Sequence, residues 1–427
     1  MKEIFIIILS VLVFNVLLLI PFSKIINFKA KTVTNFYSFL SENLIVIFNY
    51  LLLLTFLNLN LKNILIVFII SSIFFSIIFK KTFLQLIKFN IFLFFFIFIV
   101  FLLSVDLSYN LTLYWDAQSM WLPKAIMFFE NNTINDLKKF LRPEYPYLGS
   151  LIWAFFWKLS IIEYEYLGRI SYIMCFCLSI FTFIDLAQQK NVSYFSIILI
   201  FILCIYDYWH FRGSQEILIF SFLLLSTKYL YLIIVENDLK THNLIFFLLS
   251  LNLIIWTKNE GLFFSTFLFI PFLGYSKYEI KKKVISIIIF LFLILLRFGI
   301  YEINDLRVGL SPDFQLDKIF SILISNINLN NLVFILKHII FSTIKFPFIL
   351  LSIIVFIILI LQKKDLKKFN FIYVYMCLNI SFIIFVYLSS TKDLNFMVET
   401  GLNRLVFESF APILIFTLPY IKNLFKK

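Results

Sequence analysis

Long apolar runs alternate with short polar breaks along almost the whole chain. Each run has about 15 to 20 residues, close to the length that a helix needs to cross the hydrocarbon of a bilayer. The runs are continuous rather than alternating residue by residue, which argues against a transmembrane barrel. The pattern therefore predicts an all-α, polytopic bundle of about thirteen membrane-spanning helices, near residues 4–21, 43–59, 64–79, 89–105, 170–187, 194–207, 217–235, 244–257, 261–275, 284–300, 347–361, 371–388 and 405–421.

Two other apolar stretches read differently from the spans. Segment 146–162 is short and interrupted by Lys158, and segment 331–346 carries two lysines and a histidine before Pro347. Such mixed segments are typical of helices that lie in the membrane interface. We expect interfacial helices at both places, with a spanning helix as the alternative for 146–162.

Segment 106–147 is the main exception to the apolar pattern. It contains Asp116 between aromatic residues, Lys124, and the element Arg142-Pro143-Glu144-Tyr145-Pro146. A chain in lipid can place a long polar segment only outside the hydrocarbon. Long loops of this kind are commonly functional, so we expect a site here.

Lysines at the ends of the apolar runs indicate the orientation, because cytoplasmic loops carry an excess of positive charge. The clusters are Lys24, Lys29 and Lys31; Lys80, Lys81 and Lys88; Lys190; Lys240; Lys277 and Lys281–Lys283; Lys363–Lys368; and Lys422–Lys427. Placing them all in the cytoplasm gives one consistent alternation, although the orientation of the first three spans stays open. Five loops then share the extracytoplasmic side, namely 106–147, 207–216, 258–260, 301–330 and 389–404.

Composition supports this class. The chain is 62% hydrophobic and 14% charged, against about 45–50% and about 25% in soluble domains. Its net charge of +13 is explained by topology, and we expect membrane lipids rather than nucleic acid as partners. Four cysteines lie in apolar stretches and three histidines are scattered, which fits neither a zinc site nor a disulfide framework. We therefore expect an integral plasma-membrane (bacterial inner-membrane) protein.

Two carboxylates on the expected outer side are candidate catalytic groups. Asp116 could act as a general base or bind a sugar or cation; the alternative is an N-cap of a helix at 117–129. Glu216 begins the run 217–235, where the helix dipole alone would favour an acid. Two converging carboxylates suit acid–base or metal-assisted chemistry. No cofactor is certain, but Asp116 and Glu216 would hold a divalent cation if one is used.

The positive-inside rule disfavours Lys and Arg in extracytoplasmic loops. Cations at such positions suggest an anionic ligand, and phosphate is the natural partner of Arg and Lys. Lys124, Arg142 and Arg404 are of this kind. The alternative for Arg142 is an ion pair with a neighbouring acid. Lys258 and Glu260 occupy a polar break that is either a plain turn or a ligand contact. Glu144 and Tyr145 complete the candidate substrate-binding set.

Several short motifs resemble those of one family of membrane enzymes. They are Trp115-Asp116-Ala117 with Met120-Trp121-Leu122-Pro123-Lys124-Ala125, Arg142-Pro143-Glu144-Tyr145-Pro146, Gly168-Arg169, Glu216, Lys258-Asn259-Glu260-Gly261 and Asn403-Arg404-Leu405. With them the chain resembles the GT-C superfamily of membrane glycosyltransferases, which includes the protein O-mannosyltransferases and the aminoarabinose transferase of lipid A. The resemblance covers roughly residues 89–420. Arg142 replaces a usual His, Glu216 stands where Asp is commoner, and Met397-Val398 replaces a frequent Trp-His.

The resemblance implies a GT-C-like module at 89–427, preceded by N-terminal spans at 1–88. It implies an inverting transfer of a sugar from a polyprenyl-phosphate donor to a lipid, glycan or protein acceptor on the extracytoplasmic face. Asp116 would be the base and Glu216 a supporting or metal-binding acid. Arg142, Lys258 and Arg404 would contact the phosphate.

Two alternatives remain. A surface-polysaccharide polymerase or ligase would carry a large, Arg-rich late loop, whereas 301–330 is modest and has Arg307. A transporter or flippase of lipid-linked sugars would carry ionisable residues within its spans and broken helices in repeated halves. Here few ionisable residues besides Asp185 lie inside apolar runs, which favours the transferase.

Overall fold

The computed structural model describes residues 2–26, 36–87, 90–140, 142–160, 162–186, 192–306, 318–362 and 366–424. All regular structure within these ranges is helical, which confirms the all-α class. The α-helices are α1 (Lys2–Leu19), α2 (Phe36–Phe56), α3 (Leu61–Ile78), α4 (Lys80–Ile87), α5 (Ile91–Tyr109), α6 (Leu122–Phe129), α7 (Leu148–Leu159), α8 (Glu165–Asp185), α9 (Val192–Ile205), α10 (Glu216–Ile234), α11 (Thr241–Thr257), α12 (Gly261–Tyr275), α13 (Ile280–Ile303), α14 (Ile319–Asn326), α15 (Leu329–Lys345), α16 (Pro347–Leu361), α17 (Asn370–Leu388), α18 (Leu394–Met397), α19 (Asn403–Ser409) and α20 (Leu418–Leu424).

Eight helices of the described residues are long and apolar enough to cross a membrane, and up to ten if each of two bent pairs is one span. The chain is thus a helical protein of membrane type, but the predicted number of about thirteen spans is not confirmed. The difference lies mostly in helices of intermediate length. The expected spans at 194–207, 244–257, 261–275 and 347–361 correspond to α9, α11, α12 and α16, which have 14 to 17 residues.

Burial accounts for the apolar composition of α11, whereas α9 and α16 expose many of their apolar side chains. Thirteen of the 17 residues of α11 are buried inside the bundle. An apolar helix surrounded by other helices has the same composition as one surrounded by lipid. At 1.5 Å per residue, a helix of this length is shorter than the roughly 30 Å of hydrocarbon. The expected span at 405–421 is a helix bent by 45°, from Leu394–Ser409 to Ala411–Lys422.

The N-terminal helices pack directly on the rest of the bundle. α1 packs on α5, and α2 packs on α8 and α11. In α2, Asn49 donates to the carbonyl of Leu249 at 3.2 Å and accepts a bond from Asn252 at 2.7 Å. The two segments predicted to divide near residue 88 therefore share one hydrophobic core, although residues 88 and 89 lie outside the described residues.

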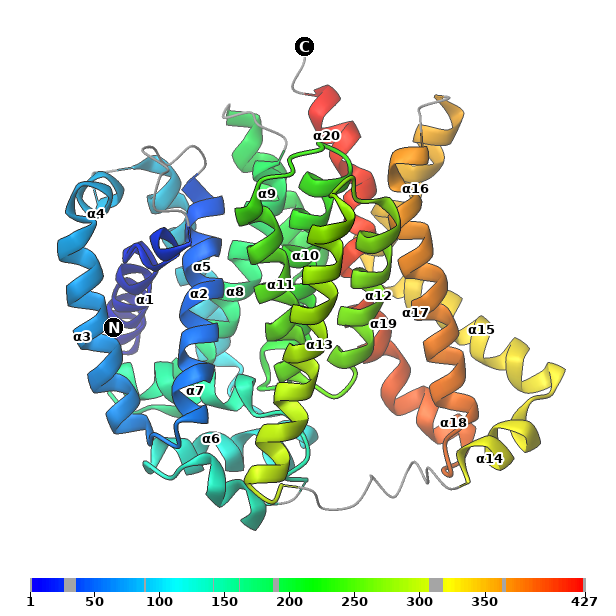
Figure 1. Ribbon diagram of the computed structural model, residues 1–427, viewed down its shortest axis with the longest axis horizontal. Coiled ribbons are helices and arrows are strands. Elements are labelled where there is room, and N and C mark those ends of the chain that lie inside the picture. Colours follow the sequence, from blue (N-terminus) through cyan, green and yellow to red (C-terminus); the bar gives the residue numbers. More distant parts are fainter. Residues whose placement is uncertain are drawn as a thin grey trace.

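Short helices gather at one end of the bundle, where α6, α7, α14 and α18 lie near the lower edge of Figure 1, opposite α4 and α20. The expected interfacial segment 146–162 forms α7, which is largely buried. The second, 331–346, forms α15, which is bent by 91° from α14 and exposes many apolar side chains. Some residues of the topology argument lie outside the described residues, namely Lys29, Lys31, Lys88, Lys190, Arg307, Lys363, Lys364, Lys426 and Lys427.

Candidate functional site

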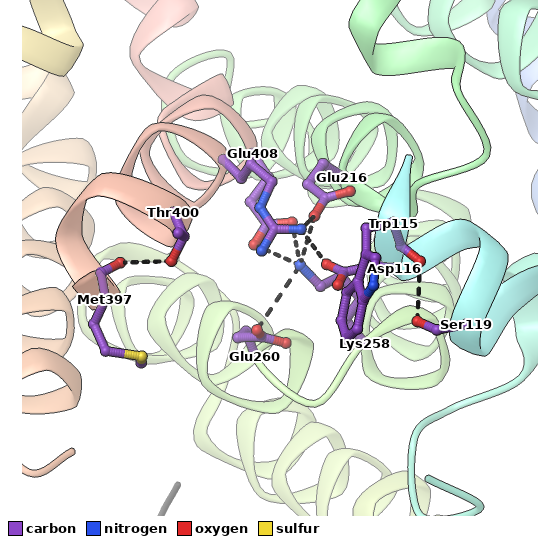
Figure 2. A network of polar contacts seen from close by, with 10 residues as sticks. Trp115, Asp116, Ser119, Glu216, Lys258, Glu260, Met397, Thr400 and Glu408 are labelled. Carbon is purple, nitrogen blue, oxygen red and sulfur yellow. Dashed lines mark hydrogen bonds and ion pairs between the residues drawn. The ribbon is translucent and has the colours of Figure 1, made fainter. Parts of the chain in front are cut away.

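Five of the nine candidate residues converge in one ionic cluster. Arg404 forms an ion pair with Asp116 and lies 3.6 Å from Glu216. The ammonium of Lys258 lies 3.3 Å from Glu216 and 3.8 Å from Glu260. Figure 2 shows the acids arranged around Lys258. Loops 106–147, 207–216, 258–260 and 389–404 therefore meet at one end of the bundle, as their predicted common side requires.

Asp116 is held in place by the loop before it. Arg169, fully buried in α8, donates to the carbonyls of Leu111 and Phe211 at 3.3 and 3.1 Å. The backbone N–H of Tyr114 donates to the carbonyl of Arg212 at 2.9 Å. The Asp116 carboxylate makes no capping bond to the helix that follows, so the N-cap alternative is wrong. Its bond goes to Arg404 instead.

Two π-helical segments flank the pair of Asp116 and Arg404. One, Ala117–Trp121, follows Asp116 directly, and the other, Val398–Leu402, ends shortly before Arg404. A π-helical turn is rare, and such turns are frequent at functional sites. Both sides of this ion pair thus carry the same uncommon backbone feature.

Glu408 is a member of the cluster that sequence reasoning missed. It is fully buried in α19, and its two oxygens lie 3.2 and 3.1 Å from the Lys258 ammonium. It stands one helical turn after Arg404, on the same helix face. The signal was present in the sequence, since a carboxylate inside the apolar run 405–421 is rarely placed there without a partner.

Lys258 is the central cation. Burial would lower its pKa, but the carboxylates of Glu216, Glu260 and Glu408 outweigh burial and hold the pKa of Lys258 well above its ordinary range. Its turn is fixed by Arg297 of α13, which donates to the carbonyl of Ile255 at 2.8 Å and to the side chain of Asn259. Arg297 was not among the sequence candidates.

Not every polar atom of the cluster has a partner. Among the described residues, the Oε2 oxygens of Glu216 and Glu260 and Nε of Arg404 form no hydrogen bond, although all three atoms are buried. Buried polar groups are bonded in the large majority of cases. The three orphan atoms are two acceptors and one donor that a ligand could satisfy.

The other four candidates form a separate group beside the cluster. Lys124 is fully buried and donates to the carbonyls of Arg142 and Tyr145 at 2.8 and 2.9 Å. Burial lowers the pKa of Lys124 to about 7, although Glu144 acts against it. The guanidinium of Arg142 lies 3.6 Å from Glu144, as its alternative reading expected. Lys124 thus fastens the 142–145 loop.

Tyr145 connects this group to the ionic cluster. Burial, with a smaller contribution from the Glu260 carboxylate, raises the pKa of the Tyr145 phenol to about 12. Tyr145 therefore lies within electrostatic reach of Glu260, and the phenol stays protonated. The ring of Tyr145 also packs edge-on against Trp121, with centroids 5.9 Å apart.

Two grooves open near the cluster. The larger, about 740 Å³, lies between α14, the start of α15 and the segment from Tyr387 to Asn395. The smaller, about 290 Å³, is lined by α15 residues including His338 and Lys345 and by Asn403, the neighbour of Arg404. Ser342 donates to Asn403 at 2.8 Å across its floor.

A metal-binding group of side chains is not evident. Within the described ranges, no three or more His, Cys, Asp or Glu side chains are grouped to hold a metal ion. In the cluster, Lys258 and Arg404 stand between the carboxylates. His210, whose ring stacks on Phe407 at 3.5 Å, has its pKa lowered to about 3 by burial and stays neutral.

Comparison of the chain with protein-family models, with curated proteins and with solved structures finds no match. The site must therefore be interpreted from its own chemistry.

Proposed function

We propose that the chain is an integral-membrane glycosyltransferase of GT-C type. It would move a sugar, with inversion, from a polyprenyl-phosphate donor to an acceptor on the extracytoplasmic face of the plasma membrane. The observation that carries the proposal is the convergence of Asp116, Glu216, Lys258 and Arg404 at one end of an apolar helix bundle. A lipid-linked donor requires such a place, since its phosphate sits where its chain leaves the hydrocarbon.

The chemistry assigns a role to each group. Asp116 would accept the proton of the acceptor hydroxyl as that oxygen attacks the anomeric carbon. Arg404 and Lys258 would stabilise the charge on the departing phosphate, a contribution that is large in a dry site. Glu216 would position both cations. Arg142, Glu144 and Tyr145 would line the approach, with Lys124 fastening their loop. No step of this proposal requires a metal ion, and the guanidinium of Arg404 occupies the place between Asp116 and Glu216.

The ion pair between Arg404 and Asp116 suggests how the donor engages the site. A donor phosphodiester carries one negative charge and would compete with Asp116 for the guanidinium. Donor binding would then release the Asp116 carboxylate to act as a base. Asp116 would thus be held by Arg404 until the donor is in place.

The first experiment replaces the proposed base. In Asp116→Asn, transfer should fall by about 10²–10⁴-fold, the usual contribution of a general base. Full-length protein in liposomes would be supplied with polyprenyl-phosphate-linked hexoses and pentoses and with envelope glycan, and sugar loss from the lipid measured by mass spectrometry. Asp136→Asn, in the same outer loop but paired with Lys139, is the matched control. Normal sugar transfer by Asp116→Asn would refute the assignment of Asp116 as the base.

The second experiment measures donor affinity in the same variant. Because Asp116 competes for Arg404, Asp116→Asn should bind polyprenyl phosphate more tightly, by about tenfold for 1.4 kcal/mol of relieved competition. Asp136→Asn should bind like the natural protein. Weaker binding in Asp116→Asn would contradict the exchange of Arg404 between carboxylate and phosphate.

One observation favours the transporter alternative. Lys228 is buried within α10, and among the described residues its ammonium forms no hydrogen bond. Asp185 is also buried, at the end of α8. Ionisable residues inside spans often mark transport pathways. If the chain is a flippase, Lys228→Met should abolish movement of a lipid-linked sugar across liposomes; if it is a transferase, sugar transfer should survive that substitution.

A further inference from the structure

The larger groove is lined by more amide and hydroxyl side chains than is usual for this apolar chain. It is about 740 Å³, within the roughly 300–1,000 Å³ of small-molecule sites. Six of its thirteen lining residues have amide or aliphatic hydroxyl side chains, in a protein that is 62% hydrophobic. They are Asn326, Asn330, Asn331, Ser390, Thr391 and Asn395, with the rings of Phe334 and Tyr387.

The asparagine side chains of this groove keep hydrogen-bonding atoms that a ligand can use. Asn326 donates to the carbonyl of Leu388, and Asn331 donates to the carbonyl of Asn326, both at 2.9 Å. These bonds fix the two side chains through their NH₂ groups and leave their oxygens as acceptors. Asn330 and Asn395 are exposed, and neither side chain has a bonding partner within the described residues.

Charge and aromaticity narrow the ligand class. The two charged residues of the lining, Lys392 and Asp393, have opposite signs, and Asp393 already caps the N–H of Phe396 at 3.0 Å. The groove therefore offers no excess charge to an anion or a cation. Several amides and hydroxyls beside aromatic rings suit a ligand that has many hydroxyl groups and apolar C–H faces, which is the chemistry of a neutral sugar.

The groove is joined to the ionic cluster by one continuous segment. The lining residue Asn395 lies in α18, which runs through the π-helical turn Val398–Leu402 to Arg404. The hydroxyl of Tyr387 lies 3.1 Å from where a Cβ of Gly401 would stand, so the groove wall packs directly on that turn. A molecule bound in the groove would have one end near the cluster.

We propose that this groove binds the neutral oligosaccharide that receives the transferred sugar, an identification of the acceptor that rests on the function proposed above. Its volume corresponds to roughly 25 water molecules at about 30 Å³ each, which suits a short glycan better than a single sugar. The amides hold the hydroxyl groups, and Phe334 and Tyr387 pack against the sugar rings. The acceptor hydroxyl is thereby directed toward Asp116.

Direct binding tests the groove. Full-length protein in amphipol, which avoids the sugar headgroups of maltoside detergents, would be titrated with cellobiose, maltose, chitobiose and mannobiose, with tetraglycine as a peptide probe. We expect at least one disaccharide to bind and tetraglycine not to bind. In Asn330→Ala/Asn395→Ala, and separately in Phe334→Ala, binding should weaken by about tenfold or more. Ser325→Ala, exposed on the same helix pair but outside the groove, should bind normally.

The outcomes separate this inference from the proposed function. Absence of disaccharide binding, preference for tetraglycine, or equal binding by the double variant and the natural protein would overturn the glycan groove. Asp116→Asn should bind the disaccharide normally while losing transfer. If that variant binds sugar and also transfers normally, the assigned catalytic role fails and the groove stands.

Discussion

Replacing Lys258 by Met removes the cation that three carboxylates share. The ammonium lies 3.1, 3.3 and 3.8 Å from Glu408, Glu216 and Glu260. The side chains of Glu408 and Glu216 are only 0% and 6% exposed, whereas that of Glu260 is 32% exposed. Removing one partner of a buried ion pair costs about 3–5 kcal/mol, because a buried charge is left uncompensated. We expect Lys258→Met to be destabilised by that amount.

Most of the stability lost in Lys258→Met should come from the carboxylate of Glu408. Glu216 keeps Arg404 at 3.6 Å, but the ion pair with Lys258 is the only one that Glu408 makes among the described residues. The double variant Lys258→Met/Glu408→Gln should therefore recover stability, with a coupling energy of about 2–3 kcal/mol in a double-mutant cycle. Replacement by a neutral amide of the same shape removes the charge without leaving a cavity.

Thermal unfolding in nanodiscs, followed by tryptophan fluorescence, measures both effects. At about 2 °C per kcal/mol for a large chain, Lys258→Met should unfold roughly 6–10 °C lower than the natural protein. Lys139→Met breaks an ion pair of 2.7 Å whose lysine is 67% exposed, and it should change stability by less than ~1 kcal/mol. Two results would refute the reasoning: a Lys258→Met protein as stable as the Lys139→Met control, or a double variant no more stable than Lys258→Met alone.

Two further predictions concern the supports of the site. The pKa of Lys124 is lowered to about 7, so the unfolded chain binds more protons than the folded one between about pH 7 and 10. Stability should rise with pH across that window, by at most ~1.4 kcal/mol per pH unit, and Lys124→Met should flatten the rise; parallel stability curves would contradict this. Gly149→Ala would place a Cβ 1.4 Å from the side-chain oxygen of buried Gln215 and should lower stability by about 1–3 kcal/mol. Gly274→Ala, in α12 with nothing within 4 Å, should be neutral or stabilising in the same unfolding assay.

The sequence predicted the site best through charged residues that lie beside long apolar runs. Glu216, Lys258 and Arg404 stand at the ends of apolar runs, Asp116 lies in the polar segment 106–147, and one lysine-based orientation put all four on one side. Helix ends on one side of a bundle share a small area, so their side chains were expected to approach one another, as they do. Glu408 was missed because its ion-pair partner, Lys258, is 150 residues away in the sequence.

Other features depend on contacts that a single sequence does not contain. The sequence does not show whether the Lys124 side chain contacts a ligand or stabilises a loop. In the structure its ammonium donates to the backbone carbonyls of Arg142 and Tyr145, so it stabilises the loop. The number of candidate spans depends on where each helix begins and ends: α11 has 17 residues and is too short, whereas α8, with 21 residues, is long enough although it is buried.

The ionic cluster is not the arrangement that stability alone would favour. It combines four carboxylates with two cations, and it leaves the second oxygen of Glu260 and Nε of Arg404 without hydrogen bonds. Well-packed apolar side chains in place of buried ion pairs are often equally or more stable. π-helical turns, which are rare and frequent at functional sites, lie on both sides of the Asp116–Arg404 pair. The orphan polar atoms are therefore expected to be completed by a ligand, and in the function proposed above a phosphate with a sugar at its end would supply both the acceptors that Arg404 lacks and the hydroxyl groups that Glu260 can bind.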